Sequence, residues 1–299
     1  MNKLKVGALA LSCALALSVG GCALDGERGE PYGIATTSMA VCQILDRLEI
    51  DEVVGIPNAA EDIDLPARYE GVRTIGNAMT PDMEILSQIN PEVVIVPRTL
   101  EAGLSEQFDN AGIEAMYFDL SSVEGMYDDI DALGALYGRE EQAAALRAEY
   151  ESYVAENSIK TDDPDTVLIL MAYPGRFYLI VTADSYVGNL IGLAGGEVVY
   201  DENYVSDGSG VAAVNPEHMV QTDPDKIVIF AHYDEENAFA YMREEIATGE
   251  IWKSFRAVQE GEVYYLSSED GFGMSCNLGW YDSFDYLTDV VFADEAEAV

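Results

Sequence analysis

Apolar and polar positions alternate between strand-like and helix-like segments along most of the chain. Helical patterns separate short apolar runs, and the first helix is predicted to begin at Thr36 or Thr37. This alternation predicts an α/β fold. The runs that predict strands are Val53–Ile56, Val93–Val96, Ala115–Phe118, Val167–Met171, Phe177–Val181, Ile227–Phe230 and Val263–Leu266.

One helix–turn–strand pattern occurs twice. Residues 84–96 and 217–229 align at an offset of 133 residues (217 − 84), which pairs Glu84 with Glu217. Each copy is preceded by a predicted helix cap with a following proline, at Thr80-Pro81 and Asn215-Pro216. Two copies so far apart predict two similar α/β lobes with a ligand cleft between them.

A longer amphipathic helix is predicted between the two copies. Ala143, Leu146 and Tyr150 recur at helical spacing, and charged residues fill the other faces. Gly138 separates this helix from the preceding helical stretch. We expect it to be the single connection between the lobes. The predicted parts are an N-terminal lobe over 34–138, the connecting helix over 139–160 and a C-terminal lobe over 161–299.

The start of the chain has the pattern of a targeting segment. Two lysines precede an apolar run, residues 6–19, that is too short to span a membrane. The run leads into Val19-Gly20-Gly21-Cys22, which resembles the lipobox of bacterial lipoproteins. Residues 1–21 are then a cleaved signal peptide, and lipidated Cys22 anchors the protein to the cell membrane through a tether over 22–33. A plain secretory signal is the alternative.

Acidic residues dominate the charge. The chain has 55 Asp and Glu residues against 15 Lys and Arg, a formal net charge of −40. Loss of residues 1–21, which hold two lysines and no acidic residue, makes this −42. Such a charge argues against nucleic acid or anionic headgroups as partners. An anionic ligand would have to be held by local donors.

The sequence gives little support to an enzyme or a metal-ion receptor. It holds two histidines, His218 and His232, whereas zinc and manganese sites use three or four His and carboxylate ligands. It has no Gly-x-Ser-x-Gly elbow, phosphate-binding Gly-rich loop or His-x-x-x-His pair. Cys42 and Cys276 remain after cleavage and lipidation, either as free thiols or as a disulfide. These features favour a binding protein.

The lipobox, the two lobes and the connecting helix together resemble the class III substrate-binding lipoproteins of ABC importers. Within that class, the chain resembles the haem-binding lipoproteins of iron-regulated surface-determinant haem uptake systems. The resemblance implies haem as ligand, an ABC permease as partner and, as a further candidate, an upstream haem donor. The stretches that carry it are Leu65–Tyr69, Gly76–Glu84, Asp184–Leu190, Leu193–Gly196 and Phe230–His232.

The resemblance implies two axial ligands for the haem iron, Met79 and His232. A thioether and an imidazole are a known axial pair. His232 also follows a predicted strand, at the carboxyl end where open α/β sheets bind ligands. On spacing alone, a methionine is more often a core residue and a lone histidine a surface residue. Met83 is a rival thioether, and Met274 and Cys276 lie in another loop that could face the cleft.

The resemblance also places the haem propionates at the start of the first helix, at Thr37 and Ser38. Helix N-termini favour anions through free N–H groups and the helix dipole. The family carries a lysine where this chain has Glu61-Asp62, so either propionate binding differs here or another cation substitutes. The candidate cations are Arg68, Arg73 and Arg176. The candidate ring contacts are Tyr178, Tyr173, Phe177 and Tyr186, for which ordinary core or surface positions are equally consistent.

The same resemblance implies that Glu84 and Glu217, one on each lobe, dock into arginine pockets of the permease. Ordinary solvated helix charge is the alternative. Two other functions stay open. A siderophore or cobalamin receptor keeps the fold, although siderophore pockets usually need several cations and this chain has few. The other is a haem sensor, which would bind the same ligand but would not deliver it to a permease.

Overall fold

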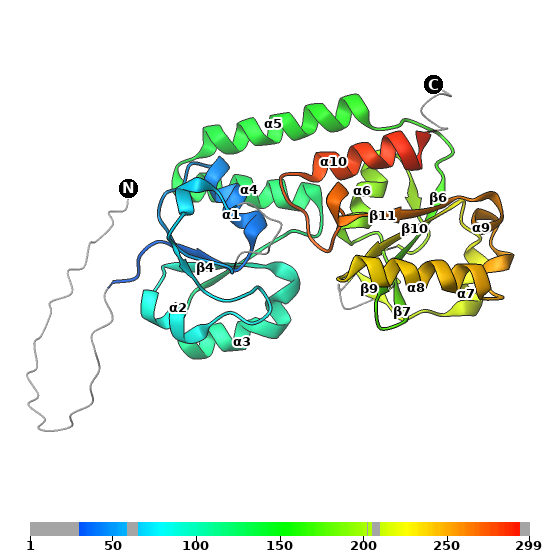
Figure 1. Cartoon of the computed structure of the whole chain (residues 1–299). Helices are drawn as coiled ribbons and strands as arrows, with labels where there is room; N and C mark the ends of the chain where they lie inside the picture. Colours follow the sequence, from blue (N-terminus) through cyan, green and yellow to red (C-terminus); the bar gives the residue numbers. More distant parts are fainter. Residues whose placement is uncertain (1–29, 59–64, 202, 205–209, 294–299) are drawn as a thin grey trace, which may run out of the picture.

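The computed structural model describes residues 30–58, 65–201, 203–204 and 210–293. The predicted signal peptide, Cys22 and most of the tether lie outside these residues, as do Glu61 and Asp62. Within the described ranges, no helix is long and apolar enough to cross a membrane. Strands and helices alternate through two lobes, which confirms the predicted α/β class (Figure 1).

The N-terminal lobe has a sheet of five parallel strands in the order β3-β2-β1-β4-β5. Helices α1 and α4 cover one face of this sheet, and α2 and α3 cover the other (Figure 1). Successive residues of β1 face opposite layers: Ile34 packs with α1 and α4, and Ala35 packs with α2 and α3. The strand order reverses between β1 and β4, the position where doubly wound sheets bind ligands. The elements are β1 Ile34–Thr36, α1 Met39–Arg47, β2 Val53–Ile56, β3 Arg73–Thr74, α2 Met83–Ile89, β4 Val93–Pro97, α3 Glu101–Ala111, β5 Ala115–Phe118 and α4 Val123–Tyr137, with 3-10 turns at Ala67–Tyr69 and Arg98–Leu100.

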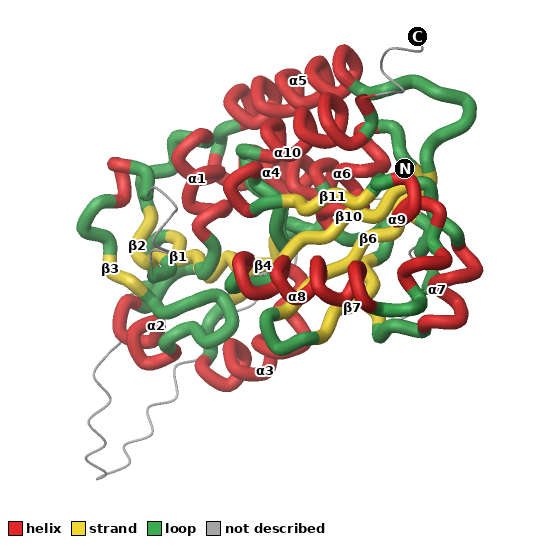
Figure 2. The backbone as a smooth tube through the Cα atoms, turned by 45° about the vertical axis from the view of Figure 1, so that its right-hand side comes forward, coloured by secondary structure: helices red, strands yellow, loops and turns green. Residues whose placement is uncertain are grey.

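The C-terminal lobe has a mixed sheet in the order β11-β10-β6-β7-β9, and β8 pairs with β6. β7 runs antiparallel to β6, while β10 and β11 run parallel to it. Figure 2 shows α6 and α10 on one side of these strands and α7 and α8 on the other. The elements are β6 Thr166–Tyr173, β7 Phe177–Val181, α6 Tyr186–Ala194, β8 Glu197–Val198, β9 Val211–Ala212, α7 Pro216–Thr222, β10 Lys226–Ala231, α8 Glu235–Thr248, α9 Arg256–Glu260, β11 Val263–Leu266 and α10 Trp280–Tyr286, with 3-10 turns at Trp252–Ser254 and Ser268–Asp270 and a π-helical turn at Leu287–Val291.

Helix α5, Glu140–Asn157, lies across both lobes (Figure 1). Its 18 residues span about 27 Å, slightly less than the predicted 139–160. Tyr150 on its buried face stacks on Tyr127 of α4 at 4.7 Å and meets Trp280 of α10 edge-on at 5.7 Å. One hydrophobic core therefore continues beneath α5 from the first lobe into the second.

The repeated sequence pattern forms the same structure twice. Helices α2 and α7 both have seven residues, and Glu84 and Glu217 are their second residues. Each helix ends at a left-handed residue, Asn90 (φ 48°) or Asp223 (φ 37°), before a buried strand begins. Asn215 caps α7 and Pro216 is its first residue, as predicted. The predicted helix–turn–strand units are therefore confirmed.

Two predicted helix starts are wrong by one or two residues. Thr36 ends β1, where its hydroxyl donates to the carbonyl of Ile95 at 3.1 Å, and Ser38 is the residue that caps α1. Asp82, rather than Thr80, caps α2 by accepting from the N–H of Ile85 at 2.9 Å. At α1 the difference arises because Thr36 pairs with the neighbouring strand β4, and at α2 the local pattern contained two possible caps, Thr80 and Asp82.

A charged contact holds the start of β10 beside β6. The carboxylate of Asp225 accepts from the hydroxyl of Thr166 at 2.6 Å and from its N–H at 2.9 Å, and it also pairs with Arg256. Burial acts to raise the pKa of Asp225. The hydrogen bonds from Thr166 and Arg256 outweigh burial and lower the pKa to about 2.

We expect Asp225→Asn to lower the free energy of unfolding by about 2 kcal/mol at neutral pH, because charge-assisted hydrogen bonds are lost. The folded pKa lies below the unfolded value, so this stabilisation is complete above about pH 4 and disappears as the pH falls toward about 2. Urea unfolding across this range should show the two proteins converging. A constant difference down to the lowest pH would contradict the assignment.

Candidate functional site

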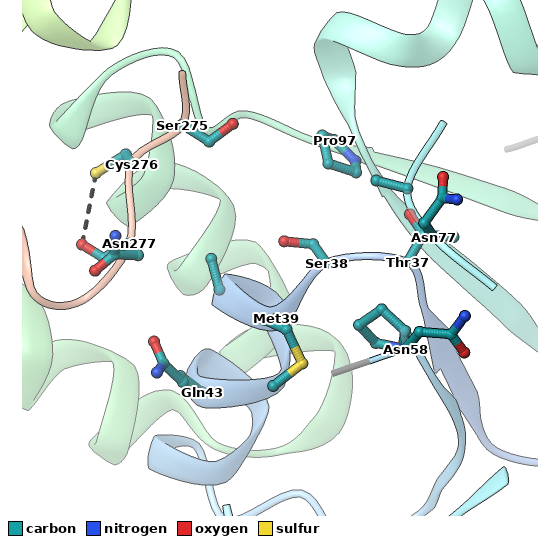
Figure 3. Close-up of a pocket in the computed structure, with 13 residues that line it drawn as sticks. Thr37, Ser38, Met39, Gln43, Asn58, Asn77, Pro97, Ser275, Cys276 and Asn277 are labelled. Carbon is teal, nitrogen blue, oxygen red and sulfur yellow. Dashed lines mark hydrogen bonds between the residues drawn. The ribbon is translucent and has the colours of Figure 1, made fainter. Parts of the chain in front are cut away.

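A cavity of about 570 Å³ opens at the carboxyl ends of β1, β2 and β4. Thr37 and Asn77 line it from the N-terminal lobe, and Ser275 and Asn277 line it from the loop between β11 and α10 (Figure 3). This is the position at which the N-terminal strand order reverses. The cavity thus lies between the lobes, in the size range of small-molecule sites.

The N-terminus of α1 supplies hydrogen-bond donors to this cavity. The first-turn N–H groups of Met39 and Ala40 have no carbonyl partner within the helix. The hydroxyl of Thr37 is buried and has no hydrogen-bond partner among the described residues. Ser38 caps the helix by accepting weakly from Val41 at 3.5 Å. Unused donors at the positive end of a helix dipole fit an anionic group.

A tight turn presents Met79 at the edge of the cavity. The side-chain oxygen of Asn77 accepts from the N–H groups of Met79 at 3.0 Å and Thr80 at 2.9 Å. Gly76 has a φ of +92°, and a Cβ there would lie 2.8 Å from the carbonyl of Thr80, so the turn needs glycine. Ala78 lines the cavity, whereas Met79 is 68% exposed. No packing in the described structure accounts for so exposed a thioether.

A second cavity of about 100 Å³ lies against the C-terminal sheet. Ser275 lines both cavities, so the two are neighbours. Phe230 of β10, Met274 and Tyr186 also line the second one. His232 follows Phe230 by two residues, about 7 Å further along the strand.

His232 lies on an aromatic surface at the carboxyl end of β10. The backbone N–H of His232 donates to the carbonyl of Ala172 at 3.2 Å, and the side chain is exposed. The imidazole lies 5.3 Å from the ring of Tyr173, which stacks on Phe177 at 4.3 Å. Tyr233, which the sequence did not suggest, lies 5.7 Å from the imidazole and is 57% exposed. This surface can accept a flat apolar ligand.

Two predicted ligand contacts lie away from both cavities. Arg68 pairs with Asp46 at 3.0 Å and Asp51 at 2.7 Å, which places it about 12 Å along α1 from Ser38. Tyr178 packs on Trp252 at 5.7 Å, on the face of the C-terminal sheet opposite His232. Neither Arg68 nor Tyr178 therefore lies beside the other predicted haem contacts.

The alternative iron ligands have other environments. Met83 packs against the core below α2 and α3, and Met274 is 42% exposed. Cys42 and Cys276 are buried free thiols rather than a disulfide. Burial raises the pKa of Cys276, which lines the larger cavity, and raises that of Cys42 to about 12. Both therefore stay protonated, whereas metal ligation needs the thiolate.

The sequence also failed to identify the amide side chains of the larger cavity. Gln43, Asn58, Asn77 and Asn277 line it. Asn77 lay within a matched motif, which was the available signal, but the other three carry no local pattern. Among the described residues, no cluster of three or more His, Cys, Asp or Glu side chains is arranged to hold a metal ion.

The family match, a related sequence and two similar structures all point to one family of binding proteins. Residues 34–269 match the model of the periplasmic binding protein family. The chain is 30% identical over 277 residues to the high-affinity heme uptake system protein IsdE of Staphylococcus aureus, covering 91% of each. Two solved structures are similar. They are an ABC transporter substrate-binding protein from Listeria monocytogenes (34% identity, TM-score 0.80) and S. aureus IsdE complexed with heme (30% identity, TM-score 0.77), each covering 88% of this chain and 100% of its own. This chain therefore belongs to the periplasmic binding protein family.

Proposed function

We propose that this protein captures haem outside the cytoplasm and delivers it to an ABC permease. The observation that carries the proposal is a cavity between the lobes that joins unused anion donors at Thr37 to the turn presenting Met79. The similarity to a heme uptake protein over 91% of the chain supports haem as the cargo. Binding and release are the whole activity, and no bond of the ligand is broken.

We propose Met79 and His232 as the axial iron ligands, one from each lobe. Met79 is exposed without a packing role, and the exposed imidazole of His232 stands on an aromatic surface suited to a porphyrin. Both follow the carboxyl ends of strands in their own sheets. Thr37 and Ser38 would receive propionate oxygens at the start of α1. Arg68 and Tyr178 have no part in this site.

The remaining predictions complete the proposal. Residues 1–21 are cleaved, lipidated Cys22 anchors the protein to the outer face of the cell membrane, and an upstream protein supplies haem. Glu84 and Glu217 dock the two lobes onto the permease. Their equal positions in α2 and α7, on opposite lobes and away from α5, support this role (Figure 1).

A siderophore receptor is the competing function within this fold. Anionic chelates usually require cationic side chains, and none of the described residues that line the two interlobe cavities is Lys or Arg. We therefore expect neither ferric siderophore nor cobalamin to bind the protein. In competition titrations, haemin should then have no bound siderophore or cobalamin to displace. Retention of a ferric siderophore that haemin cannot displace would favour the competing function.

A further inference from the structure

No charged residue is found among the described residues that line the larger cavity, although the chain carries a net charge of −40. The polar side chains among these lining residues are hydroxyls, amides and the thiol of Cys276. The described lining therefore offers a carboxylate only neutral donors. Which donors reach the ligand depends on the orientation of each amide.

Two of these amides have a fixed orientation. The side-chain oxygen of Asn277 accepts from the N–H of Gly279 at 2.7 Å. The side-chain oxygen of Asn77 accepts from the N–H groups of Met79 and Thr80. Because a backbone N–H can only donate, the oxygens are identified and the Nδ2 groups must be the free ends. Neither Nδ2 has a partner among the described residues, so both amides offer donors to the cavity.

Two further groups add to these donors from the N-terminal lobe. Thr37 is 2% exposed, and its buried hydroxyl has no partner among the described residues. Gln43 lies on α1 five residues after Ser38, is half-buried and lines the same cavity (Figure 3). Asn77 and Thr37 come from one lobe and Asn277 from the other. The donors therefore surround the cavity from both sides.

We propose that Asn277 and Asn77, with Thr37 at the start of α1, form a set of neutral hydrogen-bond donors that binds the haem propionates across the two lobes. This inference rests on haem being the cargo, and it adds the residues that recognise its carboxylates. A site built from neutral donors predicts an unusual response to salt.

The response to salt follows because no cation is found among the described lining residues. A cationic site would lose affinity as salt screens it. Here the long-range field of the acidic chain repels the two propionates of the ligand, and salt screens that repulsion instead. Haemin affinity should therefore stay constant or rise from about 0.1 M to about 1 M NaCl, as the Debye length falls from about 10 Å to about 3 Å. A tenfold fall would overturn the proposal without any variant having to fold.

The direct test uses Asn277→Asp and Asn77→Asp. Each change keeps the oxygen that accepts from the backbone and replaces the free donor with a charged acceptor. We expect haemin to bind at least about tenfold more weakly to each, because a donor becomes a repelling charge. Binding of haemin dimethyl ester, which lacks the carboxylates, should change by less than about twofold. Asn110→Asp, exposed on α3, controls for the added charge.

The outcomes separate the two proposals. Equal weakening of haemin and its dimethyl ester, or no weakening of either, would show that these amides do not bind propionates. If the folded wild-type protein binds neither ligand, the proposed function itself fails. Circular dichroism and thermal unfolding of each variant confirm that the measured protein is folded.

Discussion

Replacing His232 with alanine should weaken haemin binding by about 100-fold, or about 2.7 kcal/mol, and abolish the low-spin Soret spectrum. Imidazole is the stronger of the two proposed ligands, so its loss removes most of the iron–protein bonding. The side chain is exposed, and its ring contacts are Tyr173 and Tyr233 at the surface of the sheet. The free energy of unfolding of the ligand-free protein should therefore hardly change.

Replacing Met79 with alanine should have a smaller effect on affinity, about tenfold, because a thioether binds ferric iron weakly. The spectrum should nevertheless change from low-spin to a form with one axial position open or filled by water. Met79 makes no core contact, and the turn that presents it is held by Asn77. The variant should therefore fold as the parent does, and the spectral change reports iron ligation alone.

Matched controls exist for both ligands. His218, the other histidine, lies on α7 with its Nδ1 3.3 Å from the hydroxyl of Tyr200, and His218→Ala should leave the spectrum intact. Met83→Ala should lower the thermal stability, since Met83 packs against the core, and should also leave the spectrum unchanged. A spectrum altered by either control, or unaltered in Met79→Ala and His232→Ala, would overturn the ligand assignment.

Replacing both Glu84 and Glu217 with glutamine should remove most haem delivery while leaving haemin affinity unchanged. Each carboxylate is exposed at the second position of a short helix, and the two stand on separate lobes. If each meets an arginine of the permease, losing one leaves a cation unpaired in the interface, which typically costs 2 kcal/mol or more, or about 30-fold in affinity. Growth on haem as the iron source is the measurement.

The surroundings of the two glutamates differ, which makes the single variants informative. Glu84 accepts from Gln88 at 3.3 Å, and Gln88 accepts from Arg73 at 2.7 Å, whereas no partner of the Glu217 carboxylate is found among the described residues. Glu141→Gln, on the exposed side of α5, is the matched control. Equal growth of the double variant and this control would exclude docking through the pair.

Much of the fold could be predicted from the sequence because burial imposes regular patterns. Strands such as Val93–Pro97 are buried on both faces and appear as continuous apolar runs. The connecting helix was recognisable because Ala143, Leu146 and Tyr150 recur on one face. The repeat predicted two lobes because the same helix, turn and strand had to form twice.

Features that depend on tertiary partners could not be predicted. Strand Phe177–Val181 is apolar throughout, so its pattern could not show that Tyr178 faces away from His232. Arg68 had no visible partner until folding brought Asp46 and Asp51 beside it. The cavity amides come from distant parts of the chain, and only the fold brings them together. The resemblance identified candidate iron ligands, while the polar lining required the structure.

The most direct test of haem capture is a titration of haemin into the purified protein, followed by its absorption spectrum. We expect a sharp low-spin Soret band that saturates at one haem per protein, distinct from the broad band of free haemin. A spectrum that remains the sum of protein and free haemin, with no saturation, would contradict it.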